Sequence, residues 1–122
     1  MPVMEADRSV LAKAWLESWA TDPPSYDENT SWITVAEADP ELCFEVILEA
    51  LGMVQVKKED AKFQTLAAGP LEQLLADHGP QFIERIERLA ESNASFKLLL
   101  GNVWRNSMPE DIWSRVCKCR ES

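Results

Sequence analysis

The helical character of this chain is clearest in residues 80–91, which read PQFIERIERLAE. The apolar residues Phe82, Ile86 and Leu89 recur at intervals of four and three, and charged residues occupy most positions between them. This spacing places apolar side chains on one face of an α-helix. Pro80 fits the first turn of a helix, because the nitrogens of that turn have no acceptor within the helix. We therefore predict a helix that begins at Pro80.

Apolar stripes of the same period run through most of the chain. They predict further helices over residues 9–20, 39–51, 59–67, 71–79, 96–103 and 109–116, and either a helical turn or an extended segment near residues 32–38. Gly69-Pro70 and Gly79-Pro80 separate three of these segments, and both residue types commonly end helices. We predict an all-α fold: a single compact domain over residues 1–122, built from six or seven short helices packed as helical hairpins, with flexible ends at about 1–7 and 118–122.

The positions on the apolar stripes define the expected hydrophobic core. They are Leu11, Trp15, Phe44, Ile47, Leu48, Leu51, Leu71, Leu74, Leu75, Phe82, Ile86, Leu89, Phe96, Leu99, Leu100, Val103, Trp104, Ile112 and Trp113. Cys43 lies within an apolar helical stretch and is expected to be a small core residue. A hydrophobic content of 46% favours a folded chain despite the net charge of -9.

The charge of the chain is concentrated in its first half. Residues 1–60 contain 13 acidic and 4 basic residues, whereas residues 61–122 contain 8 of each. Nine acidic residues and no basic residue or histidine occur between Lys13 and Lys57. Such asymmetry produces a negative field that attracts cationic partners and speeds their association. It disfavours nucleic acids and anionic membranes as partners, because both need clustered basic residues.

Targeting and membrane-spanning signals are not evident. The first residues, MPVMEAD, lack the basic and apolar regions of a signal peptide. No apolar run approaches the roughly 20 residues needed to span a bilayer. We therefore predict a cytoplasmic protein.

The acidic stretch suggests a non-enzymatic domain that binds a basic protein, by analogy an inhibitor or immunity-type protein. Tryptophan and tyrosine supply much of the contact energy at protein interfaces, and four of them lie within this stretch, of which Trp15 is expected in the core. The candidate partner-binding residues are Asp22, Asp27, Glu28, Glu37, Glu41, Glu45 and Glu49, with Trp19, Tyr26 and Trp32 as aromatic anchors. Two alternatives remain for the aromatic residues: they close the 22–32 loop over the core, or they form a homodimer contact.

The alternative function is a metal- or small-molecule-responsive protein that uses His78, Cys117 and Cys119. His78 is the only histidine, and it either acts as a base or ligand or caps its helix by donating to a carbonyl near Gly79. The two cysteines form a C-x-C in a basic terminal tail, which would lower their pKa modestly. Zinc normally needs four ligands, so this set is thin and we predict no metal and no cofactor.

Catalytic motifs are absent from the sequence. It contains no glycine-rich phosphate-binding loop, no nucleophile elbow and no H-E-x-x-H. A third possibility is an enzyme with dispersed carboxylates, which would need a pocket lined by acids with raised pKa values. We predict no catalytic residues and no enzymatic activity.

A further signal in the second half of the chain comes from AAGPLEQLLADHG at 67–79, Ile83, Ile86 and Glu87, Val103 and Trp104, and Ile112, Trp113, Arg115 and Val116. Together these residues resemble a family of small bacterial all-helical proteins of unknown function. Asp39-Pro40-Glu41 resembles the start of the family's middle helix, and Trp15 matches its N-terminal tryptophan. Phe44 stands where the family pattern has tryptophan. The resemblance covers roughly residues 11–116 and implies an all-helical fold, but no activity.

Overall fold

All regular elements are helices in the computed structural model, which describes residues 8–20, 31–105 and 107–120. They are α1 (Arg8–Ala20), α2 (Trp32–Ala38), α3 (Pro40–Leu51), α4 (Ala61–Leu66), a π-helical turn (Ala67–Leu71), α5 (Glu72–Ser92), α6 (Ala94–Leu100) and α7 (Glu110–Cys119). The prediction of an all-α fold is confirmed. None of the helices in these ranges is both long and apolar enough to cross a bilayer.

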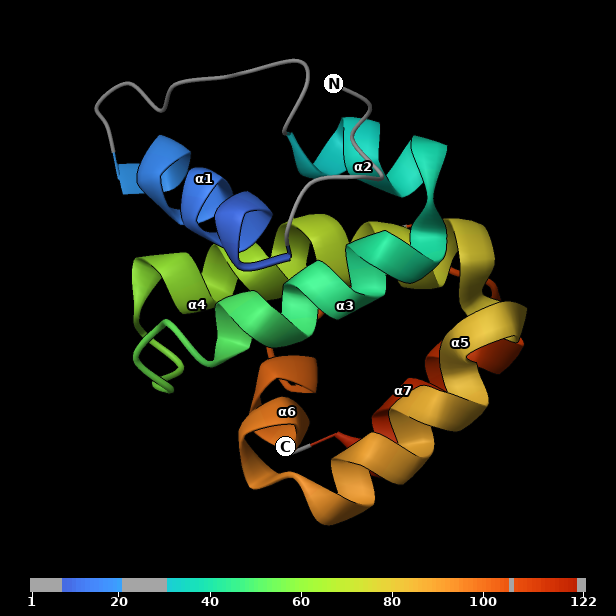
Figure 1. The fold of residues 1–122 in the computed structure, drawn as a ribbon. Helices are drawn as coiled ribbons and strands as arrows, with labels where there is room; N and C mark the ends of the chain where they lie inside the picture. The colour runs from blue at the N-terminus through green and yellow to red at the C-terminus, as the bar shows by residue number, and fades with distance from the viewer. Residues whose placement is uncertain (1–7, 21–30, 106, 121–122) are drawn as a thin grey trace.

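Two groups of helices make up the molecule (Figure 1). In the first group, α1 and α2 both pack against α3, which runs across the middle of the view. In the second, the C-terminal half of α5 packs against α6 and α7. The polypeptide from α4 to α5 connects the groups, so these residues contact both.

Side-chain caps account for most of the helix starts. Ser31, Asp39, Asp60 and Asn93 each accept a hydrogen bond from the backbone N–H three residues later, at 3.0–3.3 Å. Such a bond satisfies one of the N–H groups that the first turn of a helix leaves unpaired. Short polar residues therefore fix where α2, α3, α4 and α6 begin. Ser31 also resolves the ambiguity near residues 32–38 in favour of a helix.

The predicted helix break at Gly69-Pro70 is wrong, whereas at Gly79-Pro80 two helical segments meet at a kink, as the Gly-Pro pair predicts. A helical run of 32 residues continues from α4 through the π-helical turn to the end of α5. Pro70 is accommodated in the π-helical turn, where the hydrogen-bond ladder is already irregular. Before Pro80 the backbone leaves helical geometry at His78 (φ −133°, ψ 27°), so the helix bends there without a loop.

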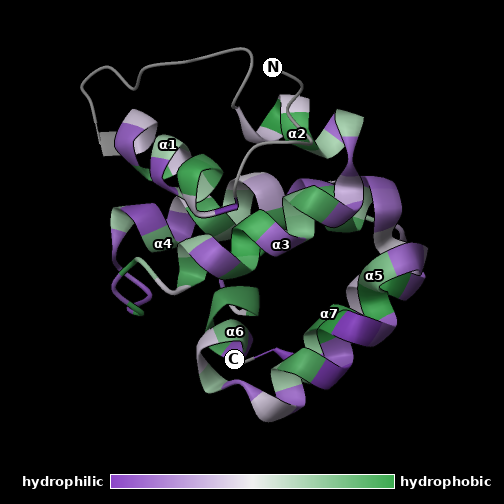
Figure 2. Ribbon diagram, viewed as in Figure 1, coloured by the Kyte–Doolittle hydropathy of each residue, from purple (hydrophilic) through white to green (hydrophobic). Residues whose placement is uncertain are grey.

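Most of the predicted core is buried. Leu11, Trp15, Phe44, Phe82 and Phe96 are among the residues with 6% or less of their surface exposed. Leu48, Leu89 and Trp113 are only partly buried and pack against the outside of the core. Figure 2 shows polar and apolar residues alternating along the helices, as expected for elements with one buried face.

The prediction that Trp104 belongs to the core is wrong, because 73% of its surface is exposed. The helix that was expected to continue to residue 103 ends at Leu100. Val103 therefore turns inward and is buried, while the next side chain faces solvent. Apolar residues at helical spacing predict burial only within the helix, so the pattern no longer holds after Leu100.

An aromatic cluster joins α3, α5 and α6. The ring of Phe44 lies 5.4 Å from that of Phe82 and 6.4 Å from that of Phe96, measured between centroids. The Arg85 guanidinium lies over the first two rings, 5.2 Å from Phe44 and 4.7 Å from Phe82. Aromatic pairs of this kind contribute about 0.5–1.5 kcal/mol beyond the area they bury.

The bend of α5 packs directly against α7. A Cβ atom added at Gly79 would lie 2.9–3.1 Å from three side-chain atoms of Ile112. Further along, Arg115 donates two hydrogen bonds to the Glu87 carboxylate, and these bonds lower the pKa of Glu87. Gly79 therefore allows a helix-to-helix contact that a larger residue would prevent.

We expect Gly79→Ala to lower the free energy of unfolding by about 1–3 kcal/mol, because the added methyl group overlaps Ile112. Urea denaturation measures the loss. Gly52→Ala is the matched control: the new Cβ would meet only a carbonyl oxygen at 3.4 Å, so that variant should be neutral or slightly more stable.

A double-mutant cycle assigns the cause of this loss. Introduced into an Ile112→Ala background, Gly79→Ala should cost clearly less than it does in the wild type, because the overlapping atoms are gone. Equal costs in the two backgrounds would show that the α5–α7 contact is not the reason.

Candidate functional site

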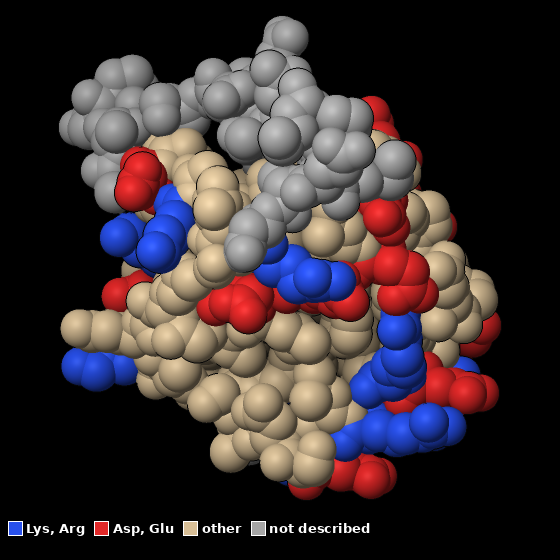
Figure 3. All heavy atoms as spheres, in the orientation of Figure 1, with Lys and Arg blue, Asp and Glu red and all other residues tan. Residues whose placement is uncertain are grey.

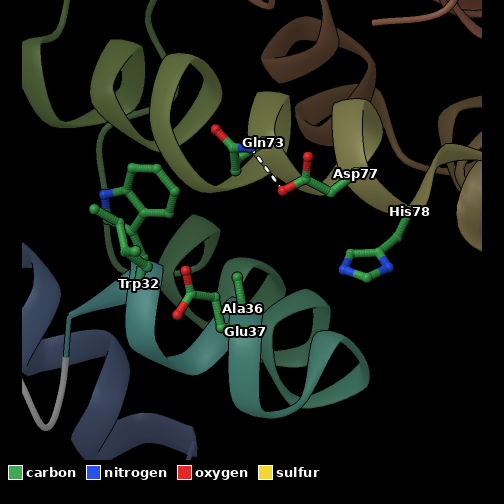
Figure 4. Close-up of a pocket in the computed structure, with 7 residues that line it drawn as sticks. Trp32, Ala36, Glu37, Gln73, Asp77 and His78 are labelled. Carbon is green, nitrogen blue, oxygen red and sulfur yellow. Dashed lines mark hydrogen bonds between the residues drawn. The ribbon is translucent and has the colours of Figure 1, made fainter. Parts of the chain in front are cut away.

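A cleft lies between α2 and the first half of α5 (Figure 4). Its volume is about 270 Å³, and its lining residues are Trp32, Ile33, Ala36, Glu37, Gln73, Asp77 and His78. The first four belong to α2 and the other three to α5. Two predicted partner-binding residues, Trp32 and Glu37, therefore meet the only histidine at one site.

Trp32 occupies a defined position at one end of the cleft. It is the first residue of α2, directly after the capping residue Ser31. A Cβ atom added at Gly69 would lie 3.3 Å from the indole Nε1 and Cε2 atoms, so the ring rests against the backbone of the π-helical turn. The glycine thus leaves the space that the indole occupies.

Glu37 and Asp77 are the two carboxylate residues that line the cleft. Glu37 is exposed and has no hydrogen-bond or ion-pair partner in the part of the chain that the structure describes. Asp77 accepts a 2.7 Å hydrogen bond from Nε2 of Gln73, one helical turn earlier. The side chains of Glu37, Gln73 and Asp77 extend into the space between the two helices (Figure 4). No lysine or arginine is found among the described residues that line this cleft.

His78 lies at the bend of α5, at the opposite end of the cleft from Trp32 (Figure 4). Its side chain makes no hydrogen bond to any residue that the structure describes, so the expected capping bond to a carbonyl is not found there. The imidazole therefore borders the cleft without a structural partner among those residues.

Two of the predicted acids already have basic partners. Arg85 donates to both carboxylate oxygens of Glu41 at 2.9 Å, and Arg8 donates to Glu45 at 2.6 Å. On the face shown in Figure 3, acidic and basic side chains are accordingly mixed rather than separated. These arginines come from before and after the base-free stretch, so sequence order alone did not indicate the pairing.

The other predicted residues are dispersed or not described. Glu49 is exposed on α3. Trp19 is half-buried and packs against Trp15 at 6.2 Å between ring centroids. Asp22, Tyr26, Asp27 and Glu28 lie outside the described residues. The structure thus brings Trp32 and Glu37 together, whereas Trp19 lies apart on α1.

The cysteines do not form a metal site with His78. Among residues 8–20, 31–105 and 107–120, no group of three or more histidine, cysteine, aspartate or glutamate side chains is placed to hold a metal ion. Cys117 and Cys119 lie in the last turn of α7 instead of in a terminal tail. Burial, followed by the charge of Glu87, raises the pKa of the Cys119 thiol, contrary to the lowering expected for a basic tail.

A second hollow surrounds the exposed Trp104. It has a volume of about 360 Å³ and also includes Val103, Trp113 and Arg120. The Arg120 guanidinium lies 4.8 Å from the centroid of the Trp113 ring and donates to the Val103 carbonyl oxygen at 3.4 Å. The sequence placed both tryptophans in the core and so did not indicate this surface.

Glu72 holds the backbone of Trp104 in place. Its carboxylate accepts a 2.9 Å hydrogen bond from the Trp104 N–H, and only 7% of the Glu72 surface is exposed. It is the one buried charged residue in the described part of the chain. Buried carboxylates need such bonds to offset the cost of leaving water.

Comparison with known proteins identifies the family. The model of a family described as "Family of unknown function (DUF6869)" matches residues 19–122. The chain belongs to this family. No curated protein and no solved structure matches the chain. The family resemblance predicted from the sequence is therefore confirmed.

The residues that carry the sequence resemblance touch one another in the fold. Glu72 of the first motif bonds to the backbone of Trp104, and Gly79 lies against Ile112. Glu87 pairs with Arg115. These contacts hold the backbone of Trp104 and helix α7 against α5. Packing between helices accounts for the residues that make these contacts. None of them is among the described residues that line the cleft between α2 and α5.

We expect Glu72→Ala to lower the free energy of unfolding by about 1.5–3 kcal/mol, because the Trp104 N–H loses a charged acceptor. Glu72→Gln keeps an acceptor oxygen and should cost less. Trp104→Ala is the control, since it retains the same backbone N–H and removes an exposed ring, and its stability should change by no more than about 0.5 kcal/mol. If Trp104→Ala costs as much as Glu72→Ala in urea denaturation, the backbone bond is not the important contact.

The three thiols should react at different rates. Burial raises the pKa of Cys43 to about 12, and the Asp39 carboxylate adds to this effect. At pH 8 a thiol with that pKa is about 10⁻⁴ ionised, and only the thiolate reacts. We expect a disulfide reagent to modify the exposed Cys117 first, Cys119 more slowly, and Cys43 only after unfolding. Single Cys→Ser variants identify each kinetic phase, and rapid modification of native Cys43 would contradict the expectation.

Proposed function

We propose that this chain is a non-enzymatic interaction domain whose N-terminal half captures a basic protein. The observation that carries the proposal is the base-free stretch between Lys13 and Lys57. Arginines from outside the stretch neutralise Glu41 and Glu45, yet Glu17, Glu37 and Glu49 stay exposed and have no ion-pair partner among the described residues. Exposed acids on one half of a molecule accelerate association with a cationic surface.

The kind of partner follows from the charge. A basic protein whose own function requires a cationic surface, such as a toxin or nuclease with a basic active site, would be blocked by an acidic domain that covers it. The inhibitor or immunity-type role rests on this analogy, and the acidic surface is the physical observation behind it. The protein is proposed to act where its partner is made, in the cytoplasm.

Other functions have less support from the geometry. The cleft contains acids and a histidine, but no hydrogen-bonded nucleophile–base pair is found in the described part of the chain. The metal-responsive alternative has no ligand cluster among those residues. A homodimer through the acidic half is opposed by repulsion between like charges.

The proposal is tested by affinity capture from cells of the native host at about 50 mM salt, with the protein immobilised through its C-terminus. We expect a basic protein to be retained. It should be released when the salt concentration is raised to about 0.15 M or more, because the Debye length then falls to about 8 Å or less and the charges are screened. Glu28→Lys with Glu49→Lys should reduce retention at least tenfold.

The control carries the same change in net charge at another place. Glu84→Lys with Glu91→Lys on α5 also changes the net charge from -9 to -5, but leaves the acidic half intact. Retention by this variant should be close to that of the wild type. Equal loss in both variants would indicate a non-specific charge effect, and retention of no basic protein by the wild type would refute the proposal.

A further inference from the structure

We infer that the cleft between α2 and α5 binds one arginine side chain of the basic partner. This inference rests on the proposed function, which it makes specific to one site. It does not depend on the number of acids alone, because the cleft combines a concave shape, an aromatic ring and a carboxylate from each of the two helices that line it.

The size of the cleft fits a single side chain. Its volume of about 270 Å³ lies just below the range of roughly 300–1,000 Å³ that is usual for small-molecule and cofactor pockets. An extended side chain from a docked protein needs less space than a cofactor. It would enter between the helices and leave its own backbone outside.

The lining offers acceptors but few donors. Glu37 on α2 and Asp77 on α5 supply two carboxylates from opposite walls, and Gln73 holds Asp77 in place through a 2.7 Å bond. Guanidinium carries five N–H donors in one plane and can bond to more than one acceptor, whereas an ammonium group is a point charge. The indole of Trp32, held against Gly69, provides a surface on which a guanidinium can stack.

The same combination of groups already holds an arginine elsewhere in the molecule. Arg85 pairs with both oxygens of Glu41 while its guanidinium lies over the rings of Phe44 and Phe82. The cleft has the equivalent aromatic ring and carboxylate in Trp32 and Glu37. What it lacks among its lining residues is the cation. The occupied internal site therefore shows the chemistry that the cleft would use with a partner's arginine.

The direct probe is the capped tripeptide acetyl-Gly-Arg-Gly-amide, added to ¹⁵N-labelled full-length protein and followed by NMR. We expect millimolar binding that shifts the indole N–H signal of Trp32 and the backbone amide signals of Glu37, Gln73 and Asp77. Trp32→Phe assigns the indole signal. The same peptide with citrulline in place of arginine keeps the shape but loses the charge, and it should bind at least tenfold more weakly.

Matched variants separate the cleft from general acidity. Glu37→Gln with Asp77→Asn removes two charges from the cleft and should weaken binding of the arginine peptide at least tenfold. Glu17→Gln with Glu49→Gln removes two charges elsewhere and should change it less than twofold. Equal effects in the two variants, or equal binding of the citrulline peptide, would overturn the inference.

The outcome can be told apart from that of the capture experiment. If a basic protein is retained but the peptide leaves the cleft signals unchanged, the arginine site is wrong and the proposed function stands. If the peptide binds in the cleft but no basic protein is retained, the cleft recognises arginine and the wider acidic half is not a capture surface.

Discussion

The bend of α5 at His78 is the constraint on which the rest of the structure depends. Pro80 has no N–H to donate to the carbonyl four residues earlier, and its ring conflicts with that carbonyl, so a straight helix is not possible there. The chain responds with one non-helical residue and continues. Before the bend, α5 faces α2 and forms one wall of the cleft; after it, α5 packs against α6 and α7. Gly79 at the bend has no side chain, so Ile112 of α7 can pack closely against α5 while the first half of α5 still faces α2.

Local signals in the sequence were sufficient for much of the fold. Spacing of apolar residues located most helices, and Asp39 before Pro40 marked a start that the structure bears out as a cap. The wrong predictions, at the first Gly-Pro pair and at Trp104, came from rules that consider only neighbouring residues. Glycine before proline usually ends a helix, but Pro70 lies inside the π-helical turn, and only the second Gly-Pro pair interrupts helical geometry, at His78. Trp104 was misplaced because the helix ends at Leu100, where Gly101 is the C-cap, while the apolar spacing continues to Val103.

The candidate site was harder to predict from the sequence than the fold. The order of charged residues along the chain does not show which of them become neighbours on the folded surface. Arg8 and Arg85 lie outside the acidic stretch, yet folding places them on Glu45 and Glu41. Exposed ion pairs of this kind add little stability, commonly less than about 1 kcal/mol, but they remove two acids from the free surface. Trp32 and Glu37 were named from sequence. Gln73 and Asp77 were not, since an exposed polar face on a helix gives no sign of which neighbour it meets.

The π-helical turn at Ala67–Leu71 sets the rotational phase of everything that follows it. Each residue of an α-helix advances about 100°, and a π-helical turn amounts to one inserted residue. A chain shortened by one residue there could run straight into α5, but every side chain after it would point about 100° away from its present direction. Glu72 would leave the backbone of Trp104, and Asp77 would turn from the cleft. The extra residue in this turn, which lies against Trp32, thus sets the rotation of the later helices relative to the earlier ones.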